Sequence, residues 1–277
     1  MEREYWLVTI SAILSGGIIF GSRLFAEIGL SFYQFSVFHV IFIFILLPLV
    51  VFKKECRPSK GMLKLFIPFG LLSASMYFTE FGPIFLGVPV AIVVLLLYTQ
   101  PVWTTVLGSL FLKENITRYK VLAVILVMLG VISLVNPFTV AGIGSVFGVM
   151  LALLGGFLLS IWIIISRIAG IRKYNPITTK FSYSIFALIF LIVFYPLTLF
   201  FVNDPTITTL SFDVSLDVWV YMGLYSVLLV FLPNILYFQG LKKVPASISG
   251  IILLLEPVVA AILASVFLQQ PLTFNIL

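Results

Sequence analysis

Charged residues are scarce in this chain, and the scarcity decides its class. Only 9% of the 277 residues are charged, 62% are hydrophobic, and the mean hydropathy is +1.24. A soluble domain of this length could not bury so much apolar surface, which excludes ordinary globular proteins. Lipid is therefore the expected solvent, and in lipid only helices or a closed barrel satisfy every backbone polar group.

Cysteine and histidine are nearly absent. Cys56 is the single cysteine and His39 the single histidine. One cysteine excludes an internal disulfide, and the two residues together are too few for a structural zinc site. We therefore expect neither a metal nor any other cofactor.

Motifs for enzymatic chemistry are also missing. The chain has no HExxH, no GxSxG and no nucleotide-binding P-loop. Its aspartates, Asp204, Asp213 and Asp217, all lie in or beside one loop. The prediction is that the chain is not an enzyme. The alternative interpretation is a membrane-embedded enzyme or a channel that lacks a recognisable motif.

Long apolar runs are what the chain has in abundance. Their length of roughly 20 residues favours helices over the shorter alternating strands of a barrel. The expected spans are 5–22, 31–52, 62–82, 88–112, 119–135, 144–167, 177–202, 217–241 and 245–268. The predicted fold class is all-α, a polytopic membrane helix bundle.

Two segments are copies of one unit. Val88–Thr117 and Val244–Thr273 align without a gap, 156 residues apart, and each contains two prolines separated by 11 residues. Duplicated membrane units are typical of transporters, because two related halves can rock about a site between them. Five helices per half is an odd number, so the halves must insert in opposite directions.

The repeat predicts the domain organisation. Residues 1–135 form the first five-helix repeat, 136–143 a connector, and 144–277 the second repeat. In the second repeat we expect four helices plus a truncated fifth, so that the tenth helix of the chain is missing or begins only near Asn275. A glycine pair marks each half, Gly16-Gly17 and Gly155-Gly156, and small residues of this kind let helices approach closely.

The basic residues are unevenly distributed. With the N-terminus placed inside, 15 of the 16 basic residues fall inside and only Arg23 falls outside. The inner residues are Arg3, Lys53, Lys54, Arg57, Lys60, Lys64, Lys113, Arg118, Lys120, Arg167, Arg172, Lys173, Lys180, Lys242 and Lys243. This predicts a multi-pass protein of the cell membrane with the N-terminus and Lys113 in the cytoplasm and Thr208 and Thr273 outside. It also explains the net charge of +6 without a nucleic-acid partner.

A family resemblance rests on the repeat. From Pro101 the chain reads P-x6-G-x2-F-L-x-E, ending at Glu114, and a helix containing Gly130 follows; Glu256–Leu268 shows a related pattern. In these features, and over nearly its whole length, the chain resembles the EamA-type family of the drug/metabolite transporter superfamily. That family has ten helices in two inverted five-helix repeats. At Gln270 this chain departs from the acid that the family often has.

The resemblance and the repeat together imply a function. We expect a secondary active carrier that moves a small organic metabolite, an exporter by resemblance, with a proton as a candidate coupling ion. The expected partners are a small-molecule substrate and the lipid bilayer, no nucleic acid is expected, and a homodimer is left open.

Two symmetry-related polar residues lie in the predicted centre. Glu256 lies roughly 16 Å from the start of its helix, close to the midplane, where a charged carboxylate is costly and is a functional candidate. Its repeat mate is Gln100, and each precedes a proline, Pro101 or Pro257. A proline inside a helix kinks the helix and frees the carbonyl four residues earlier, here that of Leu97 or Leu253. We therefore expect both residues to line one cavity that binds substrate, with Glu256 as the proton-coupling group; packing alone is the alternative.

Other polar and aromatic residues at membrane depth complete the candidate lining. They are Glu80, Tyr77, Tyr98, Trp103, Asn234, Tyr237 and Gln239. Glu80, near the outer end of its helix, is a candidate gate residue. His39 is either a proton relay or a neutral core histidine.

Overall fold

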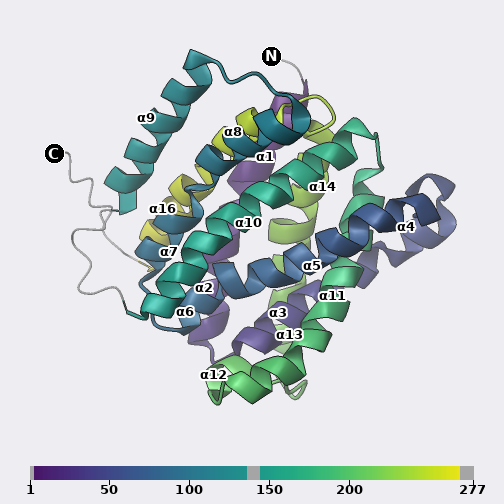
Figure 1. Ribbon diagram of the computed structural model, residues 1–277. Coiled ribbons are helices and arrows are strands. Elements are labelled where there is room, and N and C mark those ends of the chain that lie inside the picture. Colours follow the sequence, from purple (N-terminus) through teal and green to yellow (C-terminus); the bar gives the residue numbers. More distant parts are fainter. Residues whose placement is uncertain (1–2, 136–143, 269–277) are drawn as a thin grey trace.

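The computed structural model describes residues 3–135 and 144–268, and within these ranges every regular element is a helix (Figure 1). The first half contains α1 (Arg3–Ser15), α2 (Gly17–Glu27), α3 (Phe32–Ile41), α4 (Leu47–Phe52), α5 (Leu63–Glu80), α6 (Gly82–Phe85), α7 (Val90–Leu97), α8 (Gln100–Leu112) and α9 (Arg118–Val135). The second contains α10 (Val146–Ile171), α11 (Pro176–Phe201), α12 (Pro205–Thr208), α13 (Leu216–Tyr225), α14 (Leu232–Gly240), α15 (Ala246–Ile252) and α16 (Leu255–Leu268). The predicted connector and the predicted start of a tenth helix at Asn275 lie outside the described residues.

The apolar stretches match the predicted spans. Within the described residues, seven are long and apolar enough to cross a membrane: Arg3–Glu27, Phe32–Phe52, Lys54–Ile84, Ile92–Leu112, Val146–Ile171, Pro176–Phe201 and Leu216–Gly240. A shorter apolar stretch covers Ala246–Ala260. The remaining predicted span is the 18-residue helix α9. Large side chains such as Phe200 and Phe201 are exposed on the helix surfaces, as expected where lipid is the solvent.

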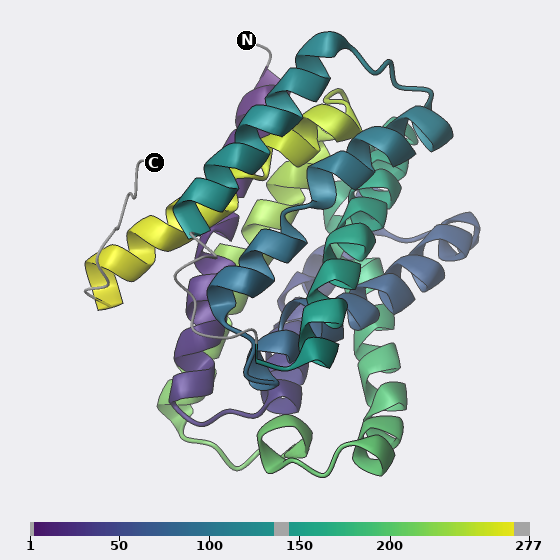
Figure 2. The same cartoon turned by 60° about the vertical axis from the view of Figure 1, so that its left-hand side comes forward.

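Residues of the two halves contact each other at the end of the bundle that holds the start of α1. There Glu114, just after α8, accepts hydrogen bonds from the backbone N–H groups of Ala246 (2.6 Å) and Ser247 (3.1 Å) and so caps α15. Lys243 forms an ion pair with Glu4 on α1 (2.9 Å). Figure 2 shows the start of α1 and the turn between α8 and α9 at this same end.

The opposite end is closed by the segment around α12. Gln34 of α3 donates from Nε2 to the carbonyl of Ser211 (2.8 Å), and Ser31 donates from Oγ to the carbonyl of Thr209. Ser31 and Gln34 also form a capping box at the start of α3, which explains why that helix begins there. The turn before α3 and α12 lie together at the bottom of Figure 2.

Each copy of the repeat is an interrupted helix rather than a kinked one. Residues 98–99 separate α7 from α8, and residues 253–254 separate α15 from α16. Pro101 and Pro257 lie at the starts of the second segments, where a proline is tolerated because its position needs no N–H donor. The expectation of a free carbonyl at Leu253 is wrong: it accepts the N–H of Glu256 (2.9 Å) in a tight turn.

Two glycines contact these breaks at close range. A Cβ atom on Gly156 of α10 would lie 2.6 Å from the carbonyl oxygen of Leu96, beside the first break. A Cβ atom on Gly16, at the junction of α1 and α2, would lie 2.6 Å from Cβ of Val259 and 2.9 Å from the carbonyl oxygen of Glu256, beside the second. The glycine pairs therefore serve packing, and they bring a helix of each half against an interrupted helix.

Candidate functional site

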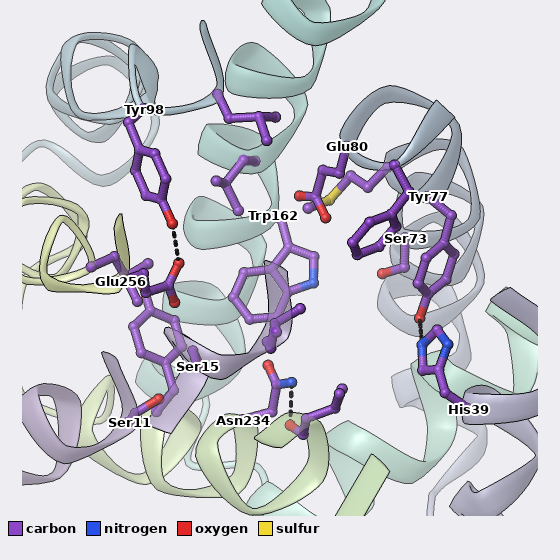
Figure 3. A pocket seen from close by; sticks show the side chains of 18 of the residues that line it. Ser11, Ser15, His39, Ser73, Tyr77, Glu80, Tyr98, Trp162, Asn234 and Glu256 are labelled. Carbon is purple, nitrogen blue, oxygen red and sulfur yellow. Dashed lines mark hydrogen bonds between the residues drawn. The ribbon is translucent and has the colours of Figure 1, made fainter. Parts of the chain in front are cut away.

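A cavity of about 160 Å³ lies in the middle of the bundle, between both halves (Figure 3). One face of α5 forms part of its wall, because Ser73, Tyr77 and Glu80 follow one another at helical spacing. Both interrupted helices contribute as well, through Tyr98 at the first break and Glu256 beside the second. The cavity is thus built from residues that are distant in sequence and come from both repeats.

Glu256 faces this cavity and not lipid. The hydroxyl of Tyr98 donates to its Oε2 at 2.9 Å, so the first interrupted helix contacts the second through a side chain. Ser15 of α1 lies beside the same carboxyl group. A carboxyl at this depth that accepts hydrogen bonds and borders open space can be stabilised in its charged form.

Glu80 reaches into the cavity from a different side, at the last turn of α5 (Figure 3). In the part of the chain that the structure describes, no hydrogen bond or ion pair engages its carboxyl group. The two acidic side chains of the cavity therefore differ in their surroundings: Glu256 has fixed donors, whereas Glu80 is available to a ligand.

His39 and Tyr77 form a hydrogen-bonded pair at the cavity wall. Nδ1 of His39 lies 2.9 Å from the carbonyl oxygen of Phe35, which can only accept, so Nδ1 carries the proton. Nε2 then accepts from the Tyr77 hydroxyl, also at 2.9 Å. With both ring nitrogens engaged, the arrangement matches the neutral core histidine that the sequence left open, although the ring still borders the cavity.

Asn234 and Tyr237 line the cavity from α14, and the local chain geometry positions them. A π-helical segment, Ser226–Phe231, precedes α14. Pro233 explains it, because a proline cannot donate to the carbonyl four residues earlier and wider turns relieve the clash. Nδ2 of Asn234 donates to the carbonyl of Val230 (2.6 Å), and its carboxamide oxygen points into the cavity in Figure 3.

Three predicted lining residues lie elsewhere. Gln100 is fully buried outside the cavity, where Nε2 donates to the carbonyl of Gly250 (2.7 Å) and Oε1 accepts from Thr104 (2.8 Å). The expectation that Gln100 and Glu256 share the cavity is therefore corrected, because the Gln100 amide joins α8 to α15. Trp103 is 38% exposed and packs edge-on against Phe157, and Gln239 does not border the cavity either.

Lys180 is the main residue that sequence reasoning placed wrongly. We counted it among the basic residues at the membrane surface, yet it is only 3% exposed and borders the cavity. Its ammonium group donates to the hydroxyl of Tyr183 (2.8 Å). The signal was its position: Lys180 comes a full turn after Pro176, the first residue of α11, and so lies inside the helix rather than before it.

Aromatic side chains that we did not single out form much of the remaining wall. They are Phe81, Trp162, Tyr183 and Tyr225. Trp162 stacks on Tyr237 with ring centroids 5.6 Å apart, which joins α10 to α14 at the cavity wall. An apolar, aromatic lining with few polar groups is typical of sites for small organic ligands.

The fold and this cavity define a class. A helical bundle with two related interrupted helices, and a cavity at their breaks lined by ionisable side chains, is the architecture of a membrane transporter. A profile of the EamA-like transporter family matches the chain twice, at residues 3–136 and 146–277. The chain belongs to the EamA-like transporter family, and it is a multi-pass membrane protein.

Relatives and a solved structure agree with this assignment. An uncharacterized transporter of Archaeoglobus fulgidus is 26% identical over 278 residues, covering 98% of this chain and 92% of its own. The uncharacterized transporter YetK of Bacillus subtilis is 30% identical over 182 residues, covering 64% of this chain and 52% of its own. A crystal structure with 13% identity superposes with a TM-score of 0.74 over 96% of this chain and 89% of that one, which shows the shared fold.

Proposed function

We propose that this protein is a secondary active carrier that moves a small organic metabolite across the cell membrane and holds it in the central cavity during transport. The observation that carries the proposal is the meeting of the two repeats at that cavity, where Tyr98 of one break hydrogen-bonds Glu256 of the other. A site shared between two related halves can be exposed to either side as the halves rock.

We favour an orientation with the N-terminus in the cytoplasm, and we favour export as the direction because of the family resemblance. The basic residues support the orientation, because the predicted spans place nearly all of them on the side of the N-terminus. Lys180 no longer belongs in that count, and the asymmetry persists without it. The family assignment supports transport rather than enzymatic chemistry.

Proton coupling through Glu256 is the second part of the proposal. Its carboxyl group is the acidic group that contacts both interrupted helices, so its protonation can favour one arrangement of the halves over the other. The groups that face it are Tyr98 at the first break, Ser15 on α1, Tyr237 on α14 and Glu80 on α5. None of them is a basic residue, so a proton or a cationic ligand would be the source of positive charge beside this carboxyl group.

Flux in liposomes tests both parts. Purified protein is reconstituted with a pH-sensitive dye inside, and a panel of amino acids, amines, carboxylic acids and sugars is added outside. We expect at least one solute to drive proton movement that needs the protein. Glu256→Gln is expected to retain the fold and solute binding but to abolish proton movement. Glu55→Gln, at an exposed position of a short 3-10 helix, should transport normally. Failure of every solute, or unchanged proton movement in Glu256→Gln, would contradict the proposal.

A further inference from the structure

The short helix α15 is buried at its start and does not cap its own first turn. Ala246 and Ser247 are buried, so the N–H groups of this turn need acceptors from the protein rather than from water. The residue at the N-cap position is Pro245, which has no polar side chain and makes no capping hydrogen bond. The acceptors for this turn therefore come from another part of the chain.

Glu114, from the other half of the chain, supplies these acceptors. Its Oε1 accepts from the N–H of Ala246 (2.6 Å), and its Oε2 accepts from the N–H (3.1 Å) and the hydroxyl (2.5 Å) of Ser247. Lys113 ends α8 with a φ of 55°, and Gly108 leaves room for the carboxyl group, because a Cβ atom there would lie 3.3 Å from Oε2. The motif that contains Gly108 and Glu114 thus builds a contact between the two halves.

α15 lies between the cavity and the end of the bundle that holds the start of α1, here called the α1 end. Its first turn is bound to Glu114 at that end, and Leu253, directly after its last residue, borders the cavity. The contact between Gln100 and Gly250 lies nearer the break, where a tilt of α15 moves the helix least. A path from the cavity past α15 to the α1 end therefore requires the first turn to leave Glu114.

The sequence of the other copy does not provide the same groups. Because the copies are 156 residues apart, the residues that correspond to Gly108, Glu114 and Ser247 are Ala264, Gln270 and Ala91. Gln270 lies outside the described residues, and its side chain carries no charge. The pairing of a carboxylate with a helix N-terminus and a serine hydroxyl is thus encoded in one half only.

We propose that Glu114 is a latch that holds α15 closed over the cavity at the α1 end, and that its carboxylate releases α15 whenever the cavity opens toward that end. Charge-assisted hydrogen bonds that exist only in the closed arrangement stabilise it over the open one. At the opposite end, Gln34 and Ser31 hold the segment around α12 through neutral side chains. The latch therefore biases the protein toward closure at the α1 end. This inference deepens the proposed function and rests on it for the alternation between two arrangements.

Access to the cavity from each side of the membrane tests the latch without a known solute. The reporter is Ser73→Cys in a Cys56→Ser background, because Ser73 borders the cavity and its hydroxyl has no hydrogen-bond partner to lose within the described chain. Its reaction rate with a small, membrane-impermeant methanethiosulfonate is measured in intact cells and in inside-out vesicles. The side from which Asn115→Cys, directly after Glu114 in the sequence, reacts identifies the α1 end.

We expect Glu114→Ala to raise the reaction rate from the α1 end about tenfold and to leave it no faster from the opposite side, since a lost cap shifts an equilibrium by about that factor. Glu114→Gln keeps an acceptor without the charge, and Ser247→Ala keeps the two backbone contacts, so each should give a smaller rise. Thr178→Val is the matched control, because it loses a different buried hydrogen bond, to the carbonyl of Cys56 (2.7 Å). This control should react as the parent protein does.

Equal rates from the α1 end in Glu114→Ala and the parent would overturn the latch. A rise from both sides, or the same rise in Thr178→Val, would overturn it as well, because a loosened bundle rather than a released helix would then explain the result. A Glu114→Ala variant that does not fold would be recognised by its melting curve, and Glu114→Gln and Ser247→Ala then decide by the same measurement.

The two proposals can fail separately. If the latch variants react as expected but no solute moves in liposomes, the latch is supported and the carrier proposal is contradicted. If a solute is transported but the reaction rates do not change, the carrier remains and the latch is overturned.

Discussion

Gln100 and Glu256 occupy equivalent positions in the two copies of the repeat, yet their surroundings differ completely. Glu256 borders the cavity, whereas the Gln100 amide is enclosed between α8 and α15 and uses both its donor and its acceptor there. The two copies of the repeat therefore share the helix break at this position. The role of the side chain differs because different residues pack against it.

Removing the Gln100 side chain should affect stability rather than binding. In Gln100→Ala the carbonyl of Gly250 loses its donor at a fully buried site, and each buried polar group left unpaired costs about 1–3 kcal/mol. We expect a lower midpoint on unfolding in mixed detergent micelles, with a ligand dissociation constant within about twofold of the parent value. Asn115→Ala, in an exposed loop, is the control. A normal midpoint with weakened binding would return Gln100 to the binding site.

Lys180 shows where sequence reasoning reached its limit at the residue scale. A lysine a few residues into a helix looks the same in the sequence whether its side chain extends to the membrane surface or turns inward. The contacts with Tyr183 and Phe231 show that the Lys180 side chain turns inward. Phe231 belongs to a π-helical segment, which no apolar pattern predicts. Glu256 was easier to place because an acid in the middle of an apolar run has few alternatives.

At the scale of elements, the two interrupted helices position the cavity. The proline spacing correctly located both interruptions, since Pro101 and Pro257 each lie in the first turn after a break. The proline spacing could not distinguish a kinked helix from an interrupted one, because the outcome depends on which neighbouring helix packs against the backbone there. Gly156 and Gly16 allow that neighbour to approach the backbone itself.

Adding a methyl group at Gly156 should separate α10 from the first break. In Gly156→Ala the new Cβ would lie 2.6 Å from the carbonyl oxygen of Leu96 and 2.7 Å from Oγ1 of Thr99, so backbone must move. We expect a loss of about 1–3 kcal/mol in the free energy of unfolding, the usual cost of overpacking. Gly130→Ala is the matched control, because nothing lies within 4 Å of a Cβ on this glycine of α9. Equal stability of the two variants would show that the contact at the break is loose.

At the scale of the whole molecule, the two ends of the bundle are distinct. The end with the start of α1 holds the contacts of Glu114 and Lys243, and the opposite end holds α12 and its contacts with α3. The fold class and the positions of the apolar stretches could be predicted from hydropathy alone, although only seven of the nine predicted spans are long and apolar enough to cross a membrane among the described residues. Which side chains face inward could not, because nearly every helix surface is apolar and the hydrophobic periodicity that marks a core is lost in lipid.

Cysteine labelling measures the orientation of the two ends. In a Cys56→Ser background, single cysteines are introduced as Thr209→Cys, beside α12, and Asn115→Cys, in the turn after α8; both positions are exposed. A membrane-impermeant maleimide should label the first in intact cells and the second only after lysis. The reverse pattern would place the N-terminus outside, and labelling of both in intact cells would refute the arrangement of the spans.

The interrupted helices have a mechanical consequence. α7 has 8 residues and α15 has 7, so each is only about 12 Å long or less, under half the thickness of the hydrocarbon core. Each segment is a short helical rod, joined to its partner by a turn of two residues whose N–H groups bond back to the preceding helix. Bending is thus concentrated at two joints, one in each half, where a swing would break only the few hydrogen bonds of the turn. A chemical crosslink across one joint would freeze that half and leave the other free to move.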